Sequence, residues 1–182
     1  MSADKELTAD EYGRMVKSAE EKGDTRLSMI LQTLGGTGIR VSELKAITLE
    51  SVNEGKVLIR NKRKERVILI PDKLARALRS YCAEKGIVSG LIFITRTGKA
   101  MDRSNIWRMI KKIGIAAGVA AKKVFPHNLR HLFARTYYQI HHDLGGLASI
   151  LGHSSVDTTR IYTADSGERE RMKMDALGLV FA

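Results

Sequence analysis

Four polar side chains in the last third of this 182-residue sequence have types and spacing suited to chemistry on a phosphate. His127 and Arg130 are three residues apart, so they share one face if the segment is helical. His153 follows Gly152, a residue type that commonly ends helices, and Tyr162 comes nine positions later. An arginine neutralises phosphate charge, histidines exchange protons, and a tyrosine oxygen can be a nucleophile. This set predicts phosphoryl transfer with Tyr162 as the attacking group.

A second arginine, Arg40, follows the glycine-rich segment Gly35-Gly36-Thr37-Gly38. The glycines predict the end of a helix, and small residues let a backbone approach a phosphate closely. Two interpretations are open on these residues alone. Arg40 either binds a phosphate, or it forms a surface ion pair with Glu43.

A charged hairpin is predicted from two apolar runs, residues 56–60 and 66–70, which flank a turn at residues 61–65. Five of the seven residues from Arg60 to Arg66 are cations. The hairpin tip is either a solvated surface loop or a cationic finger that lies in or along a DNA groove.

Capping residues, glycines and apolar spacing predict helices around this hairpin. The predicted helices cover residues 9–21, 25–34, 73–85, 103–117, 126–139 and 143–151, and another helix starts within 37–44. The expected fold is therefore mainly α with a small antiparallel β-sheet (α+β). Trp107 and Tyr137 are interpreted as packing residues, and Tyr162 is preferred over Tyr137 and Tyr138 as the reactive tyrosine. The apolar end, residues 174–181, is expected to dock on its own domain or on a neighbour.

The composition favours a polyanionic partner, most simply nucleic acid, because Lys and Arg outnumber Asp and Glu by 31 to 20. The single cysteine, Cys82, excludes an intrachain disulfide and a cysteine-based zinc site. His141 and His142 are adjacent, and adjacent histidines rarely reach one ion, so no metal site is predicted. The sequence shows no signal peptide and no membrane-spanning run, which makes the cytoplasm the expected location.

In combination these motifs resemble the catalytic domain of the tyrosine recombinases, the phage-integrase and Xer-type site-specific DNA recombinases. The resemblance covers nearly the whole chain. It rests on five motifs in the family's order and spacing: Thr37-Gly38-Ile39-Arg40-Val41-Ser42-Glu43-Leu44, the lysine hairpin, Pro126-His127-Asn128-Leu129-Arg130-His131, Leu151-Gly152-His153-Ser154-Ser155 and Thr158-Thr159-Arg160-Ile161-Tyr162-Thr163.

The resemblance implies a role for each matching position. These positions are the nucleophile Tyr162, the phosphate-binding Arg40 and Arg130, the candidate base His127 in His-x-x-Arg, and His153 where the family has His or Trp. Lys62 matches the hairpin lysine best, and Lys64 is the alternative. Asn128 stands where the family often has Asp, and Gly35-Gly36 where it often has bulky apolar residues.

By the same resemblance, Tyr162 attacks a DNA phosphodiester and gives a 3′-phosphotyrosine and a free 5′-hydroxyl, without ATP, metal or another cofactor. Residues 1–182 are expected to be one catalytic domain with a C-terminal tail at about 164–182. The family's N-terminal core-binding and arm-binding domains are not expected within this chain. The chain is interpreted as an excised domain, with a naturally short protein as the alternative. The implied partner is double-stranded DNA, bound by a homotetramer whose tails pack on neighbouring protomers, with a monomer expected free in solution and no membrane.

Alternative functions are a type IB topoisomerase-like nicking-closing enzyme, a non-catalytic integrase-derived DNA-binding module and a metal-dependent nuclease. The first two remain open, and the third lacks an acidic ligand cluster. Further candidate phosphate contacts are Arg60, Lys64, Arg96, Arg103 and Arg135.

Overall fold

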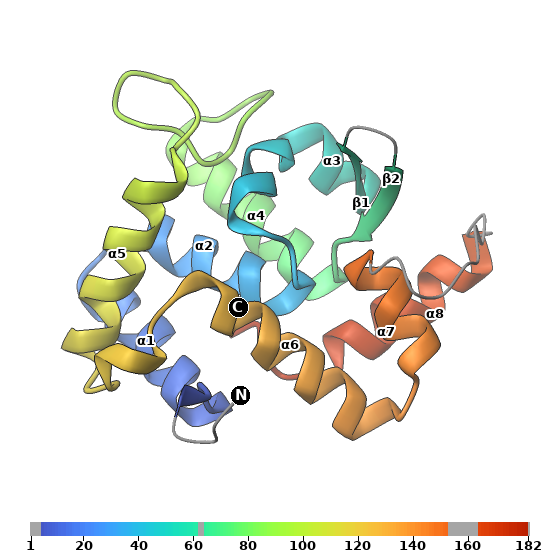
Figure 1. Ribbon diagram of the computed structural model, residues 1–182. Coiled ribbons are helices and arrows are strands. Elements are labelled where there is room, and N and C mark those ends of the chain that lie inside the picture. The colour runs from blue at the N-terminus through green and yellow to red at the C-terminus, as the bar shows by residue number, and fades with distance from the viewer. Residues whose placement is uncertain (1–4, 62–63, 153–163, 182) are drawn as a thin grey trace.

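A computed structural model describes residues 5–61, 64–152 and 164–181 of the chain. In this part of the chain a two-stranded sheet lies against a set of helices (Figure 1). The helices are α1 (Ala9–Glu21), α2 (Thr25–Thr37), α3 (Leu49–Glu54), α4 (Asp72–Lys85), α5 (Arg103–Ala116), α6 (Pro126–His141), α7 (Leu144–Leu151) and α8 (Ala164–Asp175), with the 3-10 helices η2 (Val41–Ala46) and η3 (Ala121–Lys123) and the strands β1 (Lys56–Asn61) and β2 (Lys64–Leu69). The predicted fold class is confirmed, whereas α3 and α8 were not predicted.

Side-chain caps begin three of these helices where the sequence placed them. Thr8 and Glu11 form a reciprocal capping box at α1, with hydrogen bonds of 2.9 and 3.1 Å. The Asp102 carboxylate accepts hydrogen bonds from the first turn of α5, including one of 3.0 Å from the Asn105 N–H. Asp143 caps α7 in the same way. These caps satisfy backbone N–H groups that have no partner inside the helix.

The central helix α2 is longer than predicted, because it continues through Gly35 and Gly36 and ends only at Gly38. Gly38 adopts a left-handed conformation, with φ of 65°. The prediction of a break at Gly35 was therefore wrong. Close packing explains both glycines: a Cβ atom on Gly35 would lie 2.6 Å from the Tyr12 hydroxyl, and one on Gly36 would lie 2.8 Å from a methyl of Val180. The next element, η2, is a 3-10 helix.

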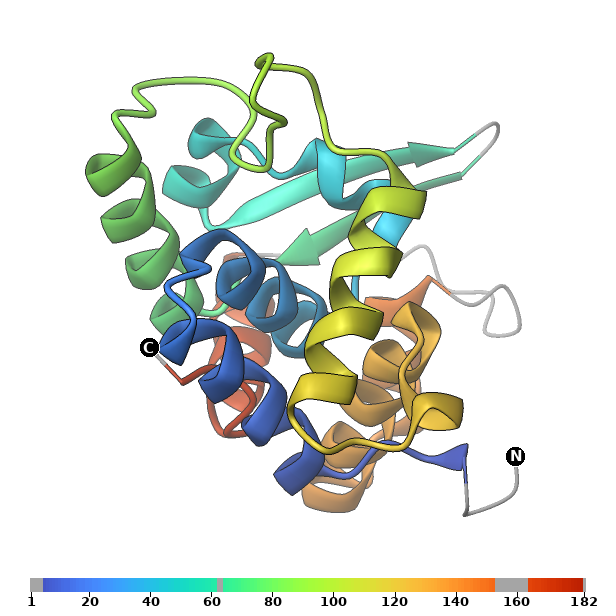
Figure 2. The ribbon, with the colours of Figure 1, turned by 90° about the vertical axis from the view of Figure 1, so that its left-hand side faces the viewer.

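The predicted hairpin is confirmed, with strands that reach further into the turn than expected. β1 and β2 pair antiparallel, with Ile59 opposite Arg66 and Asn61 opposite Lys64. Ile59 and Ile68 are buried on the face that meets the helices. Figure 2 shows the hairpin crossing above α1 and α2, with α5 in front of part of it. The inner face of β2 therefore carries Arg66 toward the interior, because alternate residues of a strand share a face.

The C-terminal tail packs on its own chain. Leu179 and Val180 are buried in the core, and the Tyr12 hydroxyl donates a hydrogen bond of 2.6 Å to the Leu179 carbonyl. The Phe181 N–H donates to the side-chain oxygen of Gln32 at 2.7 Å. Docking on its own domain is one of the two placements that the sequence predicted for the apolar end. Packing of the tail on a neighbouring protomer in an assembly stays a prediction.

Candidate functional site

Arg40 lies at the start of η2, just after the left-handed turn at Gly38. Its guanidinium is 3.1 Å from Glu43, and its backbone N–H donates to the same carboxylate at 2.9 Å. The Arg40 side chain is nevertheless 42% exposed and lines a cleft. The two interpretations of Arg40 are thus compatible, because the ion pair holds the guanidinium at the edge of an open site.

Arg130 reaches the same cleft from α6, which begins with Pro126 in its first turn. The arginine is buried, and its guanidinium donates hydrogen bonds of 2.6 Å to the carbonyls of Gly38 and Leu151. It therefore joins the end of α2 to the end of α7. His127, one turn earlier on α6, is exposed at the cleft.

Arg66 on β2 adjoins this site through Glu43, and no sequence motif predicted a role for it there. Its guanidinium forms an ion pair with Glu43 and donates to the carbonyls of Ile150 and Leu151 at 3.2 and 2.9 Å. The alternation of β2 is a signal that could have identified it, because Arg66 is two residues from the buried Ile68.

Arg40 and Arg66 both form ion pairs with Glu43, and the buried Arg130 lies close enough to feel their charges, which makes the site strongly cationic. Burial lowers the pKa of Arg130 to about 10, and the positive charges of Arg40 and Arg66 add to this effect while Glu43 opposes it. Burial likewise lowers the pKa of Arg66, against the attraction of Glu43. With a pKa of about 10, Arg130 remains protonated at neutral pH. A bound anion would relieve the mutual repulsion of the three arginines, so the arrangement favours a phosphate.

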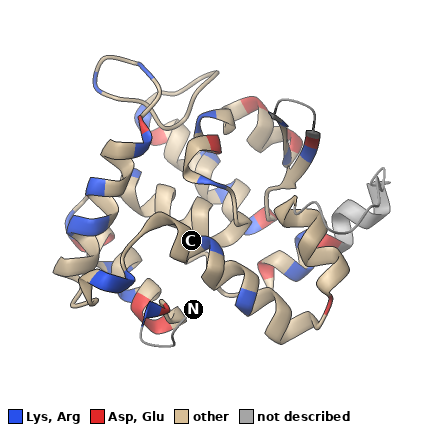
Figure 3. Cartoon of the chain, viewed as in Figure 1, with Lys and Arg blue, Asp and Glu red and all other residues tan. Residues whose placement is uncertain are grey.

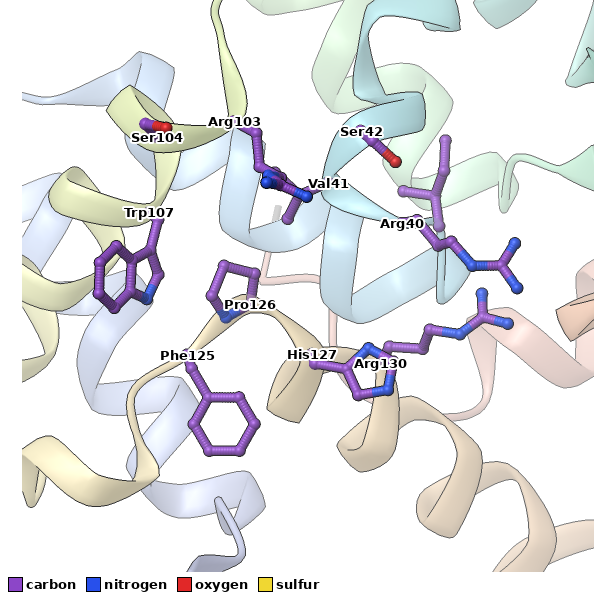
Figure 4. Close-up of a pocket in the computed structure, with 11 residues that line it drawn as sticks. Arg40, Val41, Ser42, Arg103, Ser104, Trp107, Phe125, Pro126, His127 and Arg130 are labelled. Atoms are coloured by element: carbon purple, nitrogen blue, oxygen red, sulfur yellow. The ribbon is translucent and has the colours of Figure 1, made fainter. Parts of the chain in front are cut away.

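The cleft has a volume of about 430 Å³ and two chemically different ends. Figure 4 shows Arg40 and Arg130 close together at one end, with His127 beside Arg130. Trp107 and Phe125 lie at the other end. A ligand that fills the cleft would therefore meet cations on one side and aromatic rings on the other.

Comparison with known proteins assigns this arrangement to a family. The model of the family described as "Phage integrase family" matches residues 5–169. The chain belongs to this family. Tyrosine recombinase XerD from Staphylococcus saprophyticus subsp. saprophyticus is 38% identical over 143 residues, which cover 74% of this chain and 48% of that protein. The chain thus spans about half the length of this curated relative.

Two solved structures extend the comparison of this phage integrase family member. The crystal structure of XerA recombinase superposes with a TM-score of 0.72 and 33% identity, over 93% of this chain and 62% of that one. A pre-cleavage complex of the XerH site-specific recombinase with its difH substrate gives a TM-score of 0.68 and 25% identity, over 83% of this chain and 47% of that one. The helical fold with its small sheet is therefore that of tyrosine recombinases.

Three residues of the predicted site, Lys62, His153 and Tyr162, lie outside the described residues. The two described residues before His153 nevertheless adjoin the arginines. The Leu151 carbonyl, two residues before His153, accepts from both Arg66 and Arg130. Gly152 then ends α7 with φ of 65°, and a Cβ atom there would lie 2.4 Å from the Arg66 side chain.

The five candidate DNA contacts have different surroundings. Arg103 lines the cleft. Arg60 is 75% exposed and pairs with Glu65 across the hairpin at 2.8 Å. Arg96 is exposed in the segment before α5. Arg135 instead forms an ion pair with Glu6 and donates to the Leu7 carbonyl at 2.6 Å, so its described partners belong to the chain itself. Lys64 is part of β2, and its side chain lies outside the described part. DNA contact remains a prediction for all five.

Positive charge also follows α5 beyond the cleft. Figure 3 shows Lys and Arg along this helix, which carries Arg103, Arg108, Lys111 and Lys112. Trp107, interpreted from the sequence as a packing residue, is 41% exposed and lines the cleft. That interpretation was wrong, because α5 buries Ile106, Ile110 and Ile113 and leaves Trp107 at the edge of this apolar stripe.

Residues 5–61, 64–152 and 164–181 contain no group of three or more His, Cys, Asp or Glu side chains that could hold a metal ion. His141 is half-buried and contacts the Lys173 carbonyl at 3.2 Å, while His142 is exposed at the end of α6. Within the same ranges, no helix has the length and apolarity needed to cross a membrane.

Proposed function

We propose that this chain is the catalytic domain of a site-specific DNA recombinase, which cleaves a DNA strand and rejoins it through a covalent tyrosine intermediate. One observation carries the proposal: Arg40 and Arg66 pair with Glu43 near the buried Arg130 and the exposed His127, in a member of the phage integrase family. This arrangement suits a phosphodiester, because rigid guanidiniums can bind phosphate oxygens with paired hydrogen bonds.

In the proposed step, the Tyr162 oxygen attacks the scissile phosphorus, and the bond from phosphorus to the 5′-oxygen breaks. The products are a 3′-phosphotyrosine and a strand with a 5′-hydroxyl. Free tyrosine has a pKa near 10, so its proton must pass to a base, for which His127 is the candidate. Lys62, or Lys64 in its place, donates a proton to the departing 5′-oxygen. Rejoining reverses these steps with a 5′-hydroxyl as the nucleophile.

The arginines stabilise the transition state of this step. Arg40 and Arg130 contact the non-bridging oxygens, where negative charge grows, and His153 adds another donor. Ion pairs and backbone carbonyls already fix Arg40 and Arg130, so little reorganisation accompanies the reaction. The phosphotyrosine conserves the energy of the phosphodiester, so the proposed reaction uses neither ATP nor another cofactor.

A covalent-trapping experiment tests this chemistry. The chain is incubated in EDTA with a pool of nicked duplexes of randomised sequence, in which the cleaved strand loses a short 5′-hydroxyl fragment and cannot rejoin. A denaturing gel then separates protein–DNA adducts, whose sequencing gives the target site. We expect an adduct with the wild type and with Tyr138→Phe, an exposed tyrosine on α6, and none with Tyr162→Phe. An adduct that persists in Tyr162→Phe would contradict the assigned nucleophile.

The names of the relatives favour recombination over the two alternatives, since they are recombinases. A topoisomerase-like enzyme would relax supercoiled plasmid without a second site, and a non-catalytic DNA-binding module would form no adduct. We expect relaxation to depend on the target sequence recovered from the adducts. Equal relaxation of a plasmid without this sequence would favour the topoisomerase.

The proposed partner is double-stranded DNA, bound by four copies of the protein that bring two sites together. Residues 1–182 act as one catalytic domain in this proposal, with residues 164–182 as its tail. In the absence of DNA the protein is expected to be a monomer. Light scattering coupled to size-exclusion chromatography, with and without DNA that carries two target sites, measures both states.

A further inference from the structure

The wall of the cleft opposite the arginines carries a feature that phosphate chemistry does not use. Arg103, Ser104 and Trp107 from α5 face Phe125 and Pro126 across it. Trp107 is the only tryptophan of the sequence and is 41% exposed, although indole rings are usually buried in large part. An exposed aromatic ring inside a cleft is a typical contact for a ligand with an apolar face.

The indole of Trp107 is already held on one side. The ammonium of Lys111, one turn later on α5, lies over the ring at 5.2 Å from its centroid. This cation–π contact restrains the ring, so a planar ligand would stack on the opposite face. Ser104 can donate a hydrogen bond to the edge of such a ligand, and Arg103 adds a positive charge nearby.

The arginines at the other end of the cleft indicate what the planar ligand is. A molecule with a phosphate at one end and a flat ring at the other is a nucleotide, and a cleft of about 430 Å³ is in the size range of small-molecule sites. Aromatic side chains bind nucleic-acid bases by stacking, with little dependence on sequence. In a closed duplex the neighbouring bases cover both faces, so only an unpaired base can stack on protein.

We propose that Trp107, with Arg103, Ser104 and Phe125, forms a binding subsite for an unpaired nucleotide adjacent to the phosphate that Arg40 and Arg130 hold. Strand cleavage creates such a nucleotide, because the released 5′-hydroxyl end can leave its duplex. The subsite retains or guides this end during strand exchange. This inference rests on the proposed function and assigns part of the same cleft to a second group of the substrate.

The single tryptophan makes the subsite directly measurable in the full chain. Trp107 fluorescence is titrated with inorganic phosphate, a short single-stranded oligonucleotide, a sealed duplex, and a nicked duplex with one unpaired nucleotide at the nick. We expect quenching by the single strand and by the nicked duplex. Phosphate should quench little, and the sealed duplex should bind, as measured by the anisotropy of labelled DNA, without comparable quenching.

Affinity measurements with variants complete the test. Trp107→Ala should weaken binding of the nicked duplex by about 5- to 100-fold, in line with the loss of one stacked base, and leave the sealed duplex within about 2-fold. Trp107→Phe should restore part of the loss. Ile115→Ala, which truncates another exposed apolar side chain of α5, is the matched control and should change neither affinity.

Two results would overturn the inference. In the first, Trp107→Ala weakens binding of both duplexes by the same factor, which would make Trp107 an ordinary duplex contact. In the second, the nicked duplex binds without quenching the fluorescence of Trp107, and Trp107→Ala does not change its affinity. The covalent-trapping assay separates this outcome from failure of the proposed function. An adduct without quenching refutes the subsite alone, whereas quenching without an adduct refutes the proposed chemistry and supports the subsite.

Discussion

Replacing Arg66 by methionine tests whether one buried side chain anchors the hairpin to Glu43 and the end of α7, beside the cleft. Arg66 has a side chain that is 13% exposed, and it connects β2 to Glu43 and to the end of α7. The same hairpin offers a matched control in Arg60, which also pairs with a glutamate but is 75% exposed. Methionine keeps an unbranched apolar stem in both variants and removes only the guanidinium.

The expected cost follows from the contacts of each arginine. Arg66→Met removes two hydrogen bonds from a charged donor, at 3.2 and 2.9 Å, and a buried ion pair with Glu43. Hydrogen bonds to charged groups contribute about 1.5–3 kcal/mol each. Relief of the repulsion from Arg40, and of the cost of burying a cation, offsets part of this. We expect a net loss of about 2–4 kcal/mol, against about 0–1 kcal/mol for Arg60→Met.

Urea unfolding, followed by circular dichroism, measures both values. With a slope of about 2 kcal/mol/M, Arg66→Met should lower the midpoint by roughly 1–2 M and Arg60→Met by less than about 0.5 M. Glu43→Gln completes a double-mutant cycle, in which we expect a coupling of about 1–3 kcal/mol with Arg66→Met. Arg66→Met within about 0.5 kcal/mol of the wild type, or equal losses in the two arginine variants, would refute the reasoning.

Three further predictions concern the supports of the site. Gly36→Ala should destabilise the chain by about 1–2 kcal/mol, because the added Cβ would lie 2.8 Å from Val180. In a Val180→Ala background the same substitution should be stabilising, because only the helix preference of alanine remains. Thermal unfolding of the wild type, the two single variants and the double variant measures this sign change. Burial tends to raise the pKa of Glu11, but hydrogen bonds from Lys123 and Thr8 outweigh it and leave the pKa below the usual range. The stabilisation by Glu11 is therefore complete above the pKa of the unfolded state and is lost as the pH falls through the pKa of the folded state. Glu11→Gln should lower the melting temperature at pH 7, and the melting temperatures of variant and wild type should converge near pH 3. A difference in melting temperature that stays constant with pH would contradict this linkage. Asn128→Asp should lower the free energy of unfolding by about 2–4 kcal/mol at pH 7. The buried Asn128 amide donates hydrogen bonds to the carbonyls of Lys5 and Lys123, and a carboxylate has no proton to donate. A free energy from urea unfolding within about 0.5 kcal/mol of the wild type would show that these hydrogen bonds contribute little.

The features that could be predicted from the sequence are those set by interactions between residues close together in the chain. Thr8, Asp102 and Asp143 cap helices because their side chains bind backbone N–H groups within three residues, so each start is set by a few adjacent positions. The hairpin follows from alternating apolar residues on two runs separated by a short polar turn. Arg40, His127 and Arg130 were also identified from short motifs, and the structure brings all three to one cleft.

Contacts between distant segments decided the rest. The break predicted at Gly35 did not occur, because the space left by two glycines is filled by Tyr12 and Val180, which lie far away in the sequence. The docking of the tail on its own chain depends on the same packing. No local sequence signal distinguishes a glycine that ends a helix from a glycine that leaves space for a side chain from a distant segment.

The sequence by itself determined most of the helices, the hairpin, and the Arg40, Arg130 and His127 side chains that line the cleft. Only the tertiary structure decided that Arg66 shares Glu43 with Arg40, and that Arg66 and Arg130 meet at the Leu151 carbonyl. It also decided that Trp107 faces the cleft, since burial depends on the neighbours of α5 as well as on its periodicity. The physical reason is the separation along the sequence of the residues that interact. Helix caps and the alternation of apolar residues in strands involve residues a few positions apart, whereas charge clusters and clefts form between segments up to about a hundred residues apart.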